Sequence, residues 1–424
     1  MKSFCAVSLA LGLGLGLALT APGCHRDHAA NPLAPLNPRC PAGEPPLASY
    51  AFHGDRARTG WNPLETHLTP QSVADPSFNW IWDSEPFDSV SIGGQSYPPR
   101  LYASPLYLDN VMISGTPASV VFAATSNAWV YAVSACRQTI AGQDLPAGKI
   151  LWRTQLNKPA AIAGLDGGVA LGVLSTPFID TQATPPRLYV ASEDAAAGWQ
   201  VFAVDLTNGQ VLPGWPADIN PSTLNPVNAN GPALFRDAQY MYQRAALNLS
   251  PGGEYLYAGY GSQNDTSPGW MVAIDTRQIK VVAAFAGAPS ASVVSNGGMW
   301  APGGAAVDAA GNVYATTGNG ETGPKPGYWA ESLLRWAPPL TLSGTYTPFN
   351  HCALDDADID VGGDSPILTP ELGLTAFGSK QGNVYLLEHD LLPGKLDARL
   401  PCSTDSTTDG SLLPPGPQPQ FNAR

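Results

Sequence analysis

One acidic segment of the sequence has the residue types and spacing that could hold a cation or move a proton. It places five carboxylates within ten positions: Asp355, Asp356, Asp358, Asp360 and Asp364. Calcium prefers oxygen ligands of this kind, and a positioned carboxylate can act as a general base. The alternative is a polar turn in which the Asp side chains accept hydrogen bonds from nearby backbone N–H groups.

An EF-hand is not the source of this pattern. The D-x-D-x-D run at 356–360 is similar to the start of a calcium loop, but Gly362 comes one place late. Ile367 stands where an EF-hand has its bidentate Glu. The segment therefore keeps three interpretations, which are a capped turn, a cation site and a catalytic base.

Other chemistry is less well supported. Trp129, Trp152 and Trp300 could stack on a planar cofactor, although aromatic side chains more often pack protein cores. The six histidines show no ligand spacing, and neither a G-x-S-x-G elbow nor a phosphate-binding loop is present. The formal net charge of −13 and the lack of a basic patch argue against nucleic acid as a partner.

Six cysteines are present, and four remain once Cys5 of the expected signal and the lipidation candidate Cys24 are set aside: Cys40, Cys136, Cys352 and Cys402. An even number in an exported protein indicates up to two disulfides. Three pairings are allowed, and we favour Cys40–Cys136 with Cys352–Cys402, because each would tie neighbouring segments. No C-x-x-C pair occurs, which argues against zinc, a redox motif and covalently attached haem.

The N-terminus is typical of an export signal. Residues 1–23 begin with a basic residue, continue through an apolar run and end in small residues. The Gly before Cys24 resembles a bacterial lipobox, although Ala21 stands where Leu is usual. We therefore expect a lipoprotein anchored to the membrane through Cys24, in the periplasm or at the outer membrane; the alternative is simple cleavage and a periplasmic or secreted protein. No later stretch reaches the ~20 apolar residues of a membrane span.

The rest of the chain divides by composition. Residues 24–48 are rich in Pro and Ala and read as a tether. Residues 49–396 contain alternating apolar and polar strands separated by turn residues. Residues 397–424 are rich in Pro, Ser and Thr and predict a flexible tail. The chain has 44 Gly and 42 Pro but only 13% charged residues, which favours a turn-rich, mostly β globular fold.

The central region repeats one supersecondary unit. Val121–Trp152 contains strand, polar turn, strand, loop and the start of another strand, and five such units follow one another along the chain. The second unit, for example, predicts strands at 175–180, 188–192, 201–205 and 209–212. A repeat of roughly 65 residues with about four short strands predicts an all-β propeller of four-stranded blades, and a β-sandwich is the alternative.

The number of blades stays open at about five to eight. Residues 49–100 could supply part of a sixth unit and complete a short ring. Alternatively, further blades follow the last residue, and this is the expectation that we favour, because a propeller closes by pairing its first and last strands.

Several motifs in order resemble the quinoprotein, or PQQ-like, β-propeller repeat. The segment VYAVSA…AGKILW is similar to the recurring blade ending of that family. Further resemblance lies in ARTGWNPLETHLTPQSV, YASPLYLDNV, MWAPGGAAVDAAGNVYATTGNGE, DIDVGGDSPILTP and GSKQGNVYLLEHDLLPG. Together these motifs cover roughly residues 50–395 and identify an exported or lipoprotein branch of the family.

The family contains PQQ-dependent alcohol dehydrogenases and non-enzymatic lipoproteins of outer-membrane assembly. In the dehydrogenases, an Asn in a Thr-Gly-Asn turn helps to hold Ca²⁺ beside PQQ, and a later Asp is the general base. The resemblance therefore implies that Asn319 and Asp360 bind Ca²⁺, that Asp358 or Asp360 is the base, and that Trp300 and Asn319 contact the cofactor. An Asn-Gly pair is also typical of a purely structural turn.

The functional prediction follows from how much of this pattern is present. The adjacent cysteines that pack on the quinone in many of these enzymes do not occur here. No clear counterpart of their acidic calcium ligand from an earlier blade stands out either. We therefore favour a non-catalytic extracytoplasmic module that binds a protein or a small molecule at the propeller face. The alternative is a dehydrogenase that uses PQQ and calcium.

Overall fold

The structure, a computed structural model, describes most of the chain beyond the expected leader. The described residues are 37–40, 48–65, 68–76, 78, 81–162, 168–235, 241–262, 267–290 and 297–412. The expected signal peptide, the lipidation candidate Cys24 and most of the tether lie outside them. No helix among the described residues is both long and apolar enough to cross a membrane.

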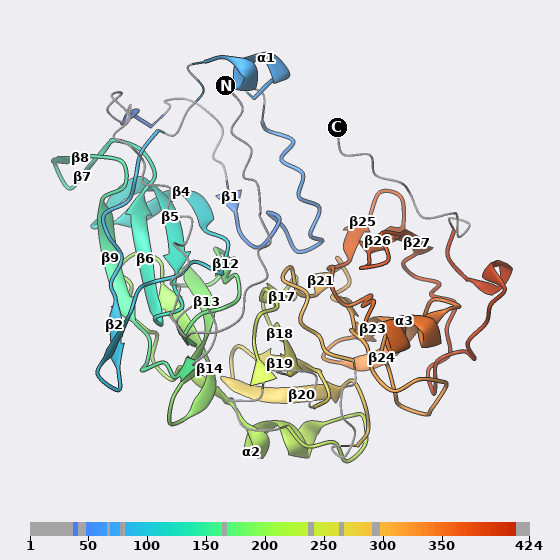
Figure 1. The fold of residues 1–424 in the computed structure, drawn as a ribbon. Helices are drawn as coiled ribbons and strands as arrows, with labels where there is room; N and C mark the ends of the chain where they lie inside the picture. The colour runs from blue at the N-terminus through green and yellow to red at the C-terminus, as the bar shows by residue number, and fades with distance from the viewer. Residues whose placement is uncertain are drawn as a thin grey trace, which may run out of the picture.

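Five antiparallel sheets, which we call blades 1 to 5, stand side by side in an arc around the segment 48–60 (Figure 1). Blade 1 contains β4 (Leu106–Ile113), β5 (Thr116–Ala124), β6 (Trp129–Ser134) and β9 (Ile150–Gln155), with β1 (Ala48–Ser49) added to β4. Blade 2 contains β12 (Phe178–Asp180), β13 (Arg187–Asp194), β14 (Gly198–Asp205) and β15 (Ala217–Ile219).

The remaining blades follow the same order. Blade 3 contains β16 (Met241–Tyr242), β17 (Asn248–Leu249), β18 (Tyr255–Ser262), β19 (Trp270–Asp275) and β20 (Lys280–Ala286). Blade 4 contains β21 (Ala306–Val307), β22 (Val313–Thr316), β23 (Leu333–Ala337) and β24 (Thr341–Tyr346). Blade 5 contains β25 (Ile367–Thr369), β26 (Leu374–Gly378) and β27 (Val384–Glu388).

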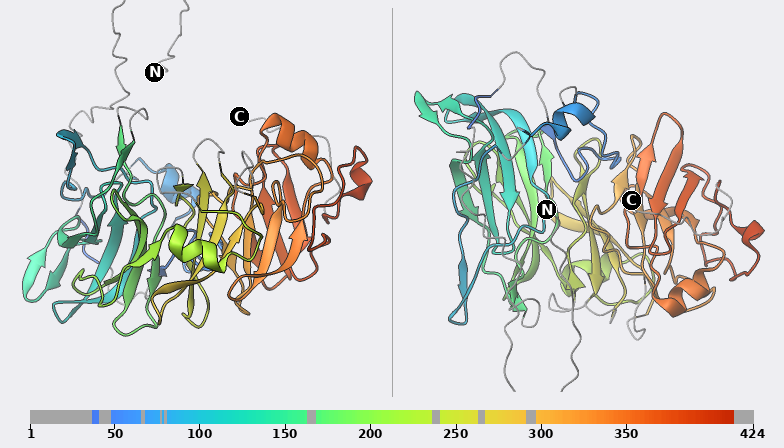
Figure 2. Two further views of the ribbon diagram at one scale, coloured as in Figure 1. Left: turned by 90° about the horizontal axis from the view of Figure 1, so that it is seen from below. Right: turned by 45° about the horizontal axis from the view of Figure 1, so that its top comes forward.

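Short hairpins and helices lie in the loops of these sheets (Figure 2). They are the hairpins β2 (Val90–Ile92) with β3 (Gln95–Tyr97), β7 (Gln138–Ile140) with β8 (Gln143–Leu145), and β10 (Ala161–Ile162) with β11 (Val169–Ala170). The short helices are α1 (Pro70–Ala74), α2 (Pro221–Leu224) and α3 (His351–Ala357). The all-β propeller architecture predicted by the repeat is therefore confirmed.

One predicted strand is wrong. Residues 209–212 form only an isolated bridge between Val204 and Val211, and the fourth strand of blade 2 is β15. Gly209 has φ +77°, and a Cβ placed on it would lie 2.6 Å from the indole of Trp152. The chain must therefore turn at this close approach before it can pair with β14.

The core lies between adjacent sheets. Between blades 2 and 3, Trp199 packs edge-on against Tyr260 with ring centroids 6.1 Å apart. Between blades 1 and 2, Trp152 lies 5.9 Å from Phe122, and its indole N–H donates to the carbonyl oxygen of Leu206 at 2.9 Å. The side chain of Trp152 therefore serves packing between blades rather than a ligand.

The segment 48–60 ties the blades together through their first strands, which line the centre of the arc. Its backbone pairs with β4, accepts the N–H of Ile179 in blade 2 and the N–H of Val307 in blade 4, and accepts the N–H of Leu368 in blade 5. Blade 3 joins through the Asn248 amide, which donates to the carbonyl oxygen of Arg56 at 2.8 Å. One short stretch of chain therefore contacts every blade.

Arg58 anchors this segment from inside the protein. Its side chain is fully buried, and its guanidinium donates to the carbonyl oxygens of Phe52, Ala246, Leu247 and Ala305 at 2.9–3.4 Å. Burial lowers the pKa of Arg58 to about 9, and the charge of Asp55 opposes this shift. The guanidinium thus satisfies carbonyl groups that lead into the first strands of blades 3 and 4.

Two disulfides fasten the ends of the described chain. Cys40 joins Cys136 and Cys352 joins Cys402, which is the pairing that the sequence favoured. The second disulfide holds part of the expected tail against α3. In that tail Arg399 is buried, and the N–H of Leu412 donates to the carbonyl oxygen of Leu386 in β27 at 2.7 Å. Residues 397–412 are therefore packed on blades 4 and 5.

Replacing Arg58 with Met tests the anchoring role. The variant keeps an unbranched apolar stem but leaves buried carbonyl oxygens without donors, so we expect a loss of about 3 kcal/mol in the free energy of unfolding. Urea denaturation followed by tryptophan fluorescence measures this loss. Arg39→Met is the matched control, because the Arg39 side chain is 64% exposed. Equal midpoints for both variants would contradict the assigned role.

Candidate functional site

The residues singled out in the sequence meet at one end of blades 4 and 5. Trp300 precedes the first strand of blade 4, and Asn319 follows its second strand, β22. Asp358 and Asp360 lie between α3 and β25, and Lys380 follows β26, the second strand of blade 5. Because both blades are built in the same order, the ends of their second strands lie on the same face.

Asp360 is the buried carboxylate of this site. It is 2% exposed, and its Oδ1 accepts the backbone N–H of Asn319 at 2.7 Å. Its Oδ2 forms an ion pair with the ammonium group of Lys380. Asn319 and Asp360 are therefore in contact, and Lys380, which the sequence motifs did not single out, pairs with the same carboxylate.

Asp358 occupies the exposed side of the same group. It ends α3 in the left-handed conformation, with φ 53°, and its side chain is 69% exposed. Its Oδ1 accepts from the Asn319 amide at 3.1 Å and from the Lys380 ammonium at 3.3 Å. Burial opposes the charge on Lys380, but the hydrogen bonds and charges of Asp360 and Asp358 outweigh it and raise the lysine pKa.

Trp300 lies beside this cluster in a nest of glycines. A Cβ on Gly298 would lie 2.6 Å from its indole, and one on Gly261 would lie 2.8 Å from its Cβ. A Cβ on Gly318 would contact both the Trp300 Nε1 and the Asp360 Oδ1 at 2.9 Å. Only glycine therefore permits the indole and the carboxylate to sit this close together.

Two cations face the Trp300 ring. The guanidinium carbon of Arg244 lies 5.0 Å from the ring centroid, and the ammonium of Lys380 lies 6.0 Å from it. The Arg244 Nε also donates to the carbonyl oxygen of Trp300 at 3.2 Å. The site therefore combines a flat aromatic surface with positive charge, which suits a planar anionic ligand.

A second layer of buried charge holds the acidic segment in place. The Asp355 carboxylate accepts the N–H of Gly320 at 3.0 Å and pairs with Arg399 at 2.9 Å. Arg399 reaches this position because the Cys352–Cys402 disulfide fixes its segment against α3. The tail residues thus position the loop that carries Asp358 and Asp360.

Glu331 lies under the same loop and is fully buried. Its Oε2 accepts the N–H of Val361 at 2.5 Å, whereas its Oε1 has no hydrogen-bond partner among the residues that the structure describes. Burial, together with the charges of Asp360 and Asp355, raises the pKa of Glu331 to about 9. The carboxyl is therefore protonated at neutral pH, and the loop is supported by a neutral acid.

A cavity of about 530 Å³ adjoins the site, with Tyr242, Arg244 and Pro302 in its lining. Burial and the charge of Glu193, the last but one residue of β13 in blade 2, raise the pKa of the Tyr242 hydroxyl. Glu193 is 3% exposed, and within the described part of the chain its Oε2 has no hydrogen-bond partner. Burial and the charge of Asp194 raise the pKa of Glu193 to about 7. A buried carboxylate oxygen without a partner is a candidate ligand atom.

Lys380, Glu193, Arg244 and Glu331 were all missed in the sequence. A positional signal existed for two of them. Glu193 ends the second strand of its unit, Asn319 follows the second strand of the fourth unit, and Lys380 follows that of the fifth. Aligning the repeats strand by strand would have placed these three residues on one face. Arg244 and Glu331 lie in irregular segments, where no such register applies.

Comparison with solved structures identifies the fold. The chain is similar to a quinohemoprotein alcohol dehydrogenase from Comamonas testosteroni, with a TM-score of 0.50 and 13% identity over 83% of this chain and 49% of that one. A quinohemoprotein alcohol dehydrogenase from Pseudomonas putida HK5 has a TM-score of 0.52 and 14% identity, over 83% of this chain and 48% of that one. A europium-containing methanol dehydrogenase has a TM-score of 0.51 and 14% identity, over 81% of this chain and 56% of that one.

The fold is that of a quinoprotein-type β-propeller. At these identities the likeness concerns the fold alone, and the chain spans about half the length of the structures that it matches. No protein-family model matches the chain, and no curated protein does so either.

The substitution Glu331→Gln tests the neutral acid. Folding raises the pKa of Glu331 from its usual 4.5 to about 9, so its contribution to stability is complete below pH 4.5 and is lost as the pH rises to about 9. Gln keeps an acceptor for Val361 and cannot ionise. The variant should therefore gain stability relative to the native chain by up to about 1.4 kcal/mol per pH unit across this window.

Urea unfolding at pH 5, 7 and 9 measures the trend. Glu371→Gln is the matched control, because Glu371 is exposed on blade 5. A difference between Glu331→Gln and the native chain that stays constant with pH would contradict the protonated state.

Proposed function

We propose that this chain is a quinone-dependent dehydrogenase that binds a PQQ-type cofactor and a divalent cation at the Trp300–Asp360 site and oxidises an alcohol there. The observation that carries the proposal is the meeting of Asp360, Asn319 and Lys380 beside the Trp300 ring. Partial motifs in the sequence favoured a non-catalytic module. The residues of these motifs lie together in the structure, beside the Lys380 ammonium and the Trp300 ring, and this arrangement supports the enzymatic alternative.

The residues present fit such a cofactor. Trp300 offers a flat aromatic surface, and close contact with the neighbouring glycines holds its ring in place. Arg244 and Lys380 supply positive charge for an anionic ring system. Asn319 and Asp360 are the oxygen donors that this site offers to a hard divalent cation. When bound, the quinone accepts two electrons and the cation acts as a Lewis acid.

The chain's own part in the reaction is to orient and to accept a proton. The Asn319 N–H and the Lys380 ammonium fix both oxygens of the Asp360 carboxylate, and its burial keeps bulk water away. We assign Asp360 as the general base that takes the alcohol proton. Asp358 is too exposed for that role, and it holds Lys380 and the Asn319 amide in position.

A second candidate function is the non-catalytic binding module. It is favoured by the Asp360–Lys380 ion pair, which already neutralises the buried carboxylate without a metal ion. In that case, a protein or a small molecule would bind at the same propeller face. For either function we place the protein outside the cytoplasm, since two disulfides are typical of exported proteins, with Cys24 as the lipid anchor.

One experiment separates the two functions. Purified protein is incubated with PQQ and Ca²⁺ and desalted, and its quinone absorbance and dye-linked oxidation of short alcohols are measured. We expect retained absorbance and turnover. Asp360→Asn should retain the quinone but lose turnover by about 10²-fold or more, because it lacks the base. Trp300→Ala should lose the quinone itself, because the stacking surface is gone.

Asp218→Asn is the matched control, since Asp218 is exposed on β15 of blade 2 and should leave both measurements unchanged. Desalted protein without quinone absorbance, at saturating PQQ and Ca²⁺, would exclude the dehydrogenase and leave the binding module. Full turnover in Asp360→Asn would exclude Asp360 as the base.

A further inference from the structure

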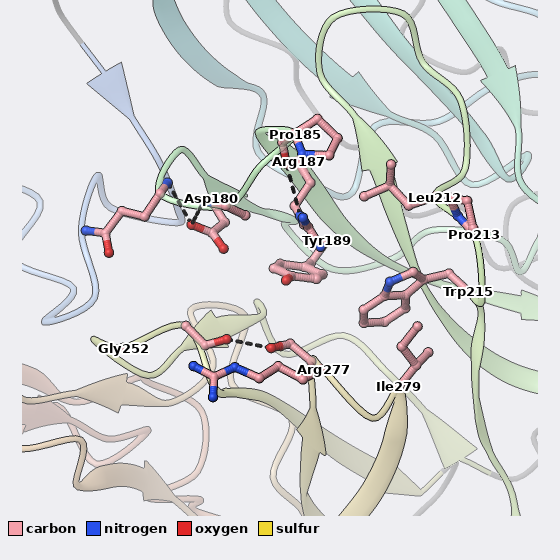
Figure 3. A pocket seen from close by; sticks show the side chains of 14 residues that line it. Asp180, Pro185, Arg187, Tyr189, Leu212, Pro213, Trp215, Gly252, Arg277 and Ile279 are labelled. Carbon is pink, nitrogen blue, oxygen red and sulfur yellow. Dashed lines mark hydrogen bonds between the residues drawn. The ribbon is translucent and has the colours of Figure 1, made fainter.

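A second cavity, of about 550 Å³, lies between blades 2 and 3 (Figure 3). It is bounded by the turn between β12 and β13, by the connection from β14 to β15, and by the turns before β18 and after β19. These turns follow the first and third strands of their blades, whereas Asn319 and Lys380 follow second strands. The cavity therefore opens at the end of the propeller opposite to the candidate quinone site.

Asp180 forms one side of the polar end of this cavity. It is 5% exposed, and its Oδ1 accepts the backbone N–H groups of Gln182 at 3.0 Å and Ala183 at 3.3 Å. Its carboxylate lines the cavity beside Gly252 and Gly253, and a Cβ on Gly253 would lie 3.7 Å from its Oδ2. Because the two glycines carry no side chains, the approach to the second carboxylate oxygen stays open.

Arg277 lies across from Asp180, at the mouth of the cavity (Figure 3). Its side chain is 75% exposed and has a long ion pair, 3.6 Å, with Glu254. The other lining arginine, Arg187, is already used, because its Nε and Nη2 donate to the carbonyl oxygens of Pro185 and Thr184 at 3.2 and 3.1 Å. Arg277 is therefore the guanidinium that can turn to a ligand.

The opposite end of the cavity is apolar. Trp215 and Tyr189 form its wall with ring centroids 5.4 Å apart and planes at 54°, and Leu212 and Ile279 lie beside them. Figure 3 shows the Trp215, Leu212 and Ile279 side chains gathered on the side away from Asp180 and Arg277. The cavity thus separates a carboxylate and a guanidinium at one end from aromatic and aliphatic groups at the other.

We propose that this cavity binds a free α-amino acid with an aromatic or large apolar side chain. The ammonium group of the ligand would pair with Asp180, its carboxylate would pair with Arg277, and its side chain would lie against Trp215 and Tyr189. Charge-assisted hydrogen bonds at both ionic groups fix the orientation, and burial of the side chain supplies apolar contact. The volume lies within the range of about 300–1,000 Å³ that is usual for small-molecule sites.

The paired charges distinguish this ligand class from simpler ones. A plain carboxylate would satisfy Arg277 but would face the Asp180 carboxylate, and a plain amine would face Arg277. A molecule that carries an ammonium group and a carboxylate on the same carbon meets both groups at once. The apolar wall then selects against small amino acids, because a ligand without a side chain leaves that surface exposed to water.

Isothermal titration calorimetry of the whole chain with four compounds tests the proposal. The compounds are L-phenylalanine, phenethylamine without the carboxylate, 3-phenylpropanoate without the ammonium, and L-alanine without the ring. We expect L-phenylalanine to bind at least tenfold more tightly than each of the others. Equal binding of all four, or no binding of L-phenylalanine, overturns the proposal.

Two variants assign the ionic contacts. Arg277→Gln lies at an exposed position that tolerates change, and it should weaken L-phenylalanine about tenfold while leaving phenethylamine unchanged. Asp180→Asn keeps the Oδ1 acceptor for its turn, and it should weaken L-phenylalanine while leaving 3-phenylpropanoate no weaker. Arg39→Gln is the control, with the same change in charge at a distant exposed site. An unchanged affinity for L-phenylalanine in Arg277→Gln rejects the assigned orientation, whether or not Asp180→Asn folds.

Discussion

The arrangement of the blades depends on one buried cation, the Arg58 guanidinium. Each sheet can satisfy its own backbone within the ladder, but the chain that leads into a first strand presents carbonyl groups to the centre of the arc. Arg58 donates to four such oxygens, from its own segment and from blades 3 and 4. Because a buried unpaired carbonyl costs about 1–3 kcal/mol, this side chain adds a polar connection between blades 3 and 4 and the segment 48–60 to the apolar packing between the sheets.

The candidate site depends on the same kind of device at its own end. Its carboxylates sit on an irregular loop, and such loops are usually mobile unless they are held by specific contacts. Here the Arg399–Asp355 ion pair, the neutral Glu331 and the Cys352–Cys402 disulfide fix the loop from below. Asp360, which we propose as the general base, can then keep one geometry with Asn319 and Lys380, which is the condition for proton transfer at a defined distance.

Repeats and motifs predicted much of the fold, and the reason lies in the periodicity of strands. Alternating residues such as those of β14 and β18 need buried faces wherever the chain places them, so their existence follows from the sequence. Residues 209–212 have the residue types of a strand, but they do not form the strand that was predicted. Gly209 lies against the Trp152 ring there, and such a tertiary contact cannot be seen in a local sequence pattern. The role of Arg58 escaped prediction for the same reason.

The site shows the same division. Asn319 and Asp360 were found because they stand in motifs, and their contact joins turns of two adjacent blades. Lys380 stands inside a quoted motif as well, but its role depends on a register between units that single motifs do not express. Glu331 carries no local signal at all, since its raised pKa comes from burial beneath a loop about 30 residues further along the chain.

The distribution of charge gives a last reason to regard the Trp300–Asp360 face as functional. Only 13% of the residues are charged, yet Asp355, Asp360 and Arg399 are buried close together there, with the neutral acid Glu331 beneath them. A buried ion pair is seldom more stable than the apolar residues that could replace it. The burial of Arg58 is explained by its hydrogen bonds to blades 3 and 4, and that of Arg399 by its ion pair with Asp355 in the loop. Neither of these contacts explains the burial of Glu193, whose Oε2 has no hydrogen-bond partner among the described residues, and we therefore regard Glu193 as a candidate ligand residue.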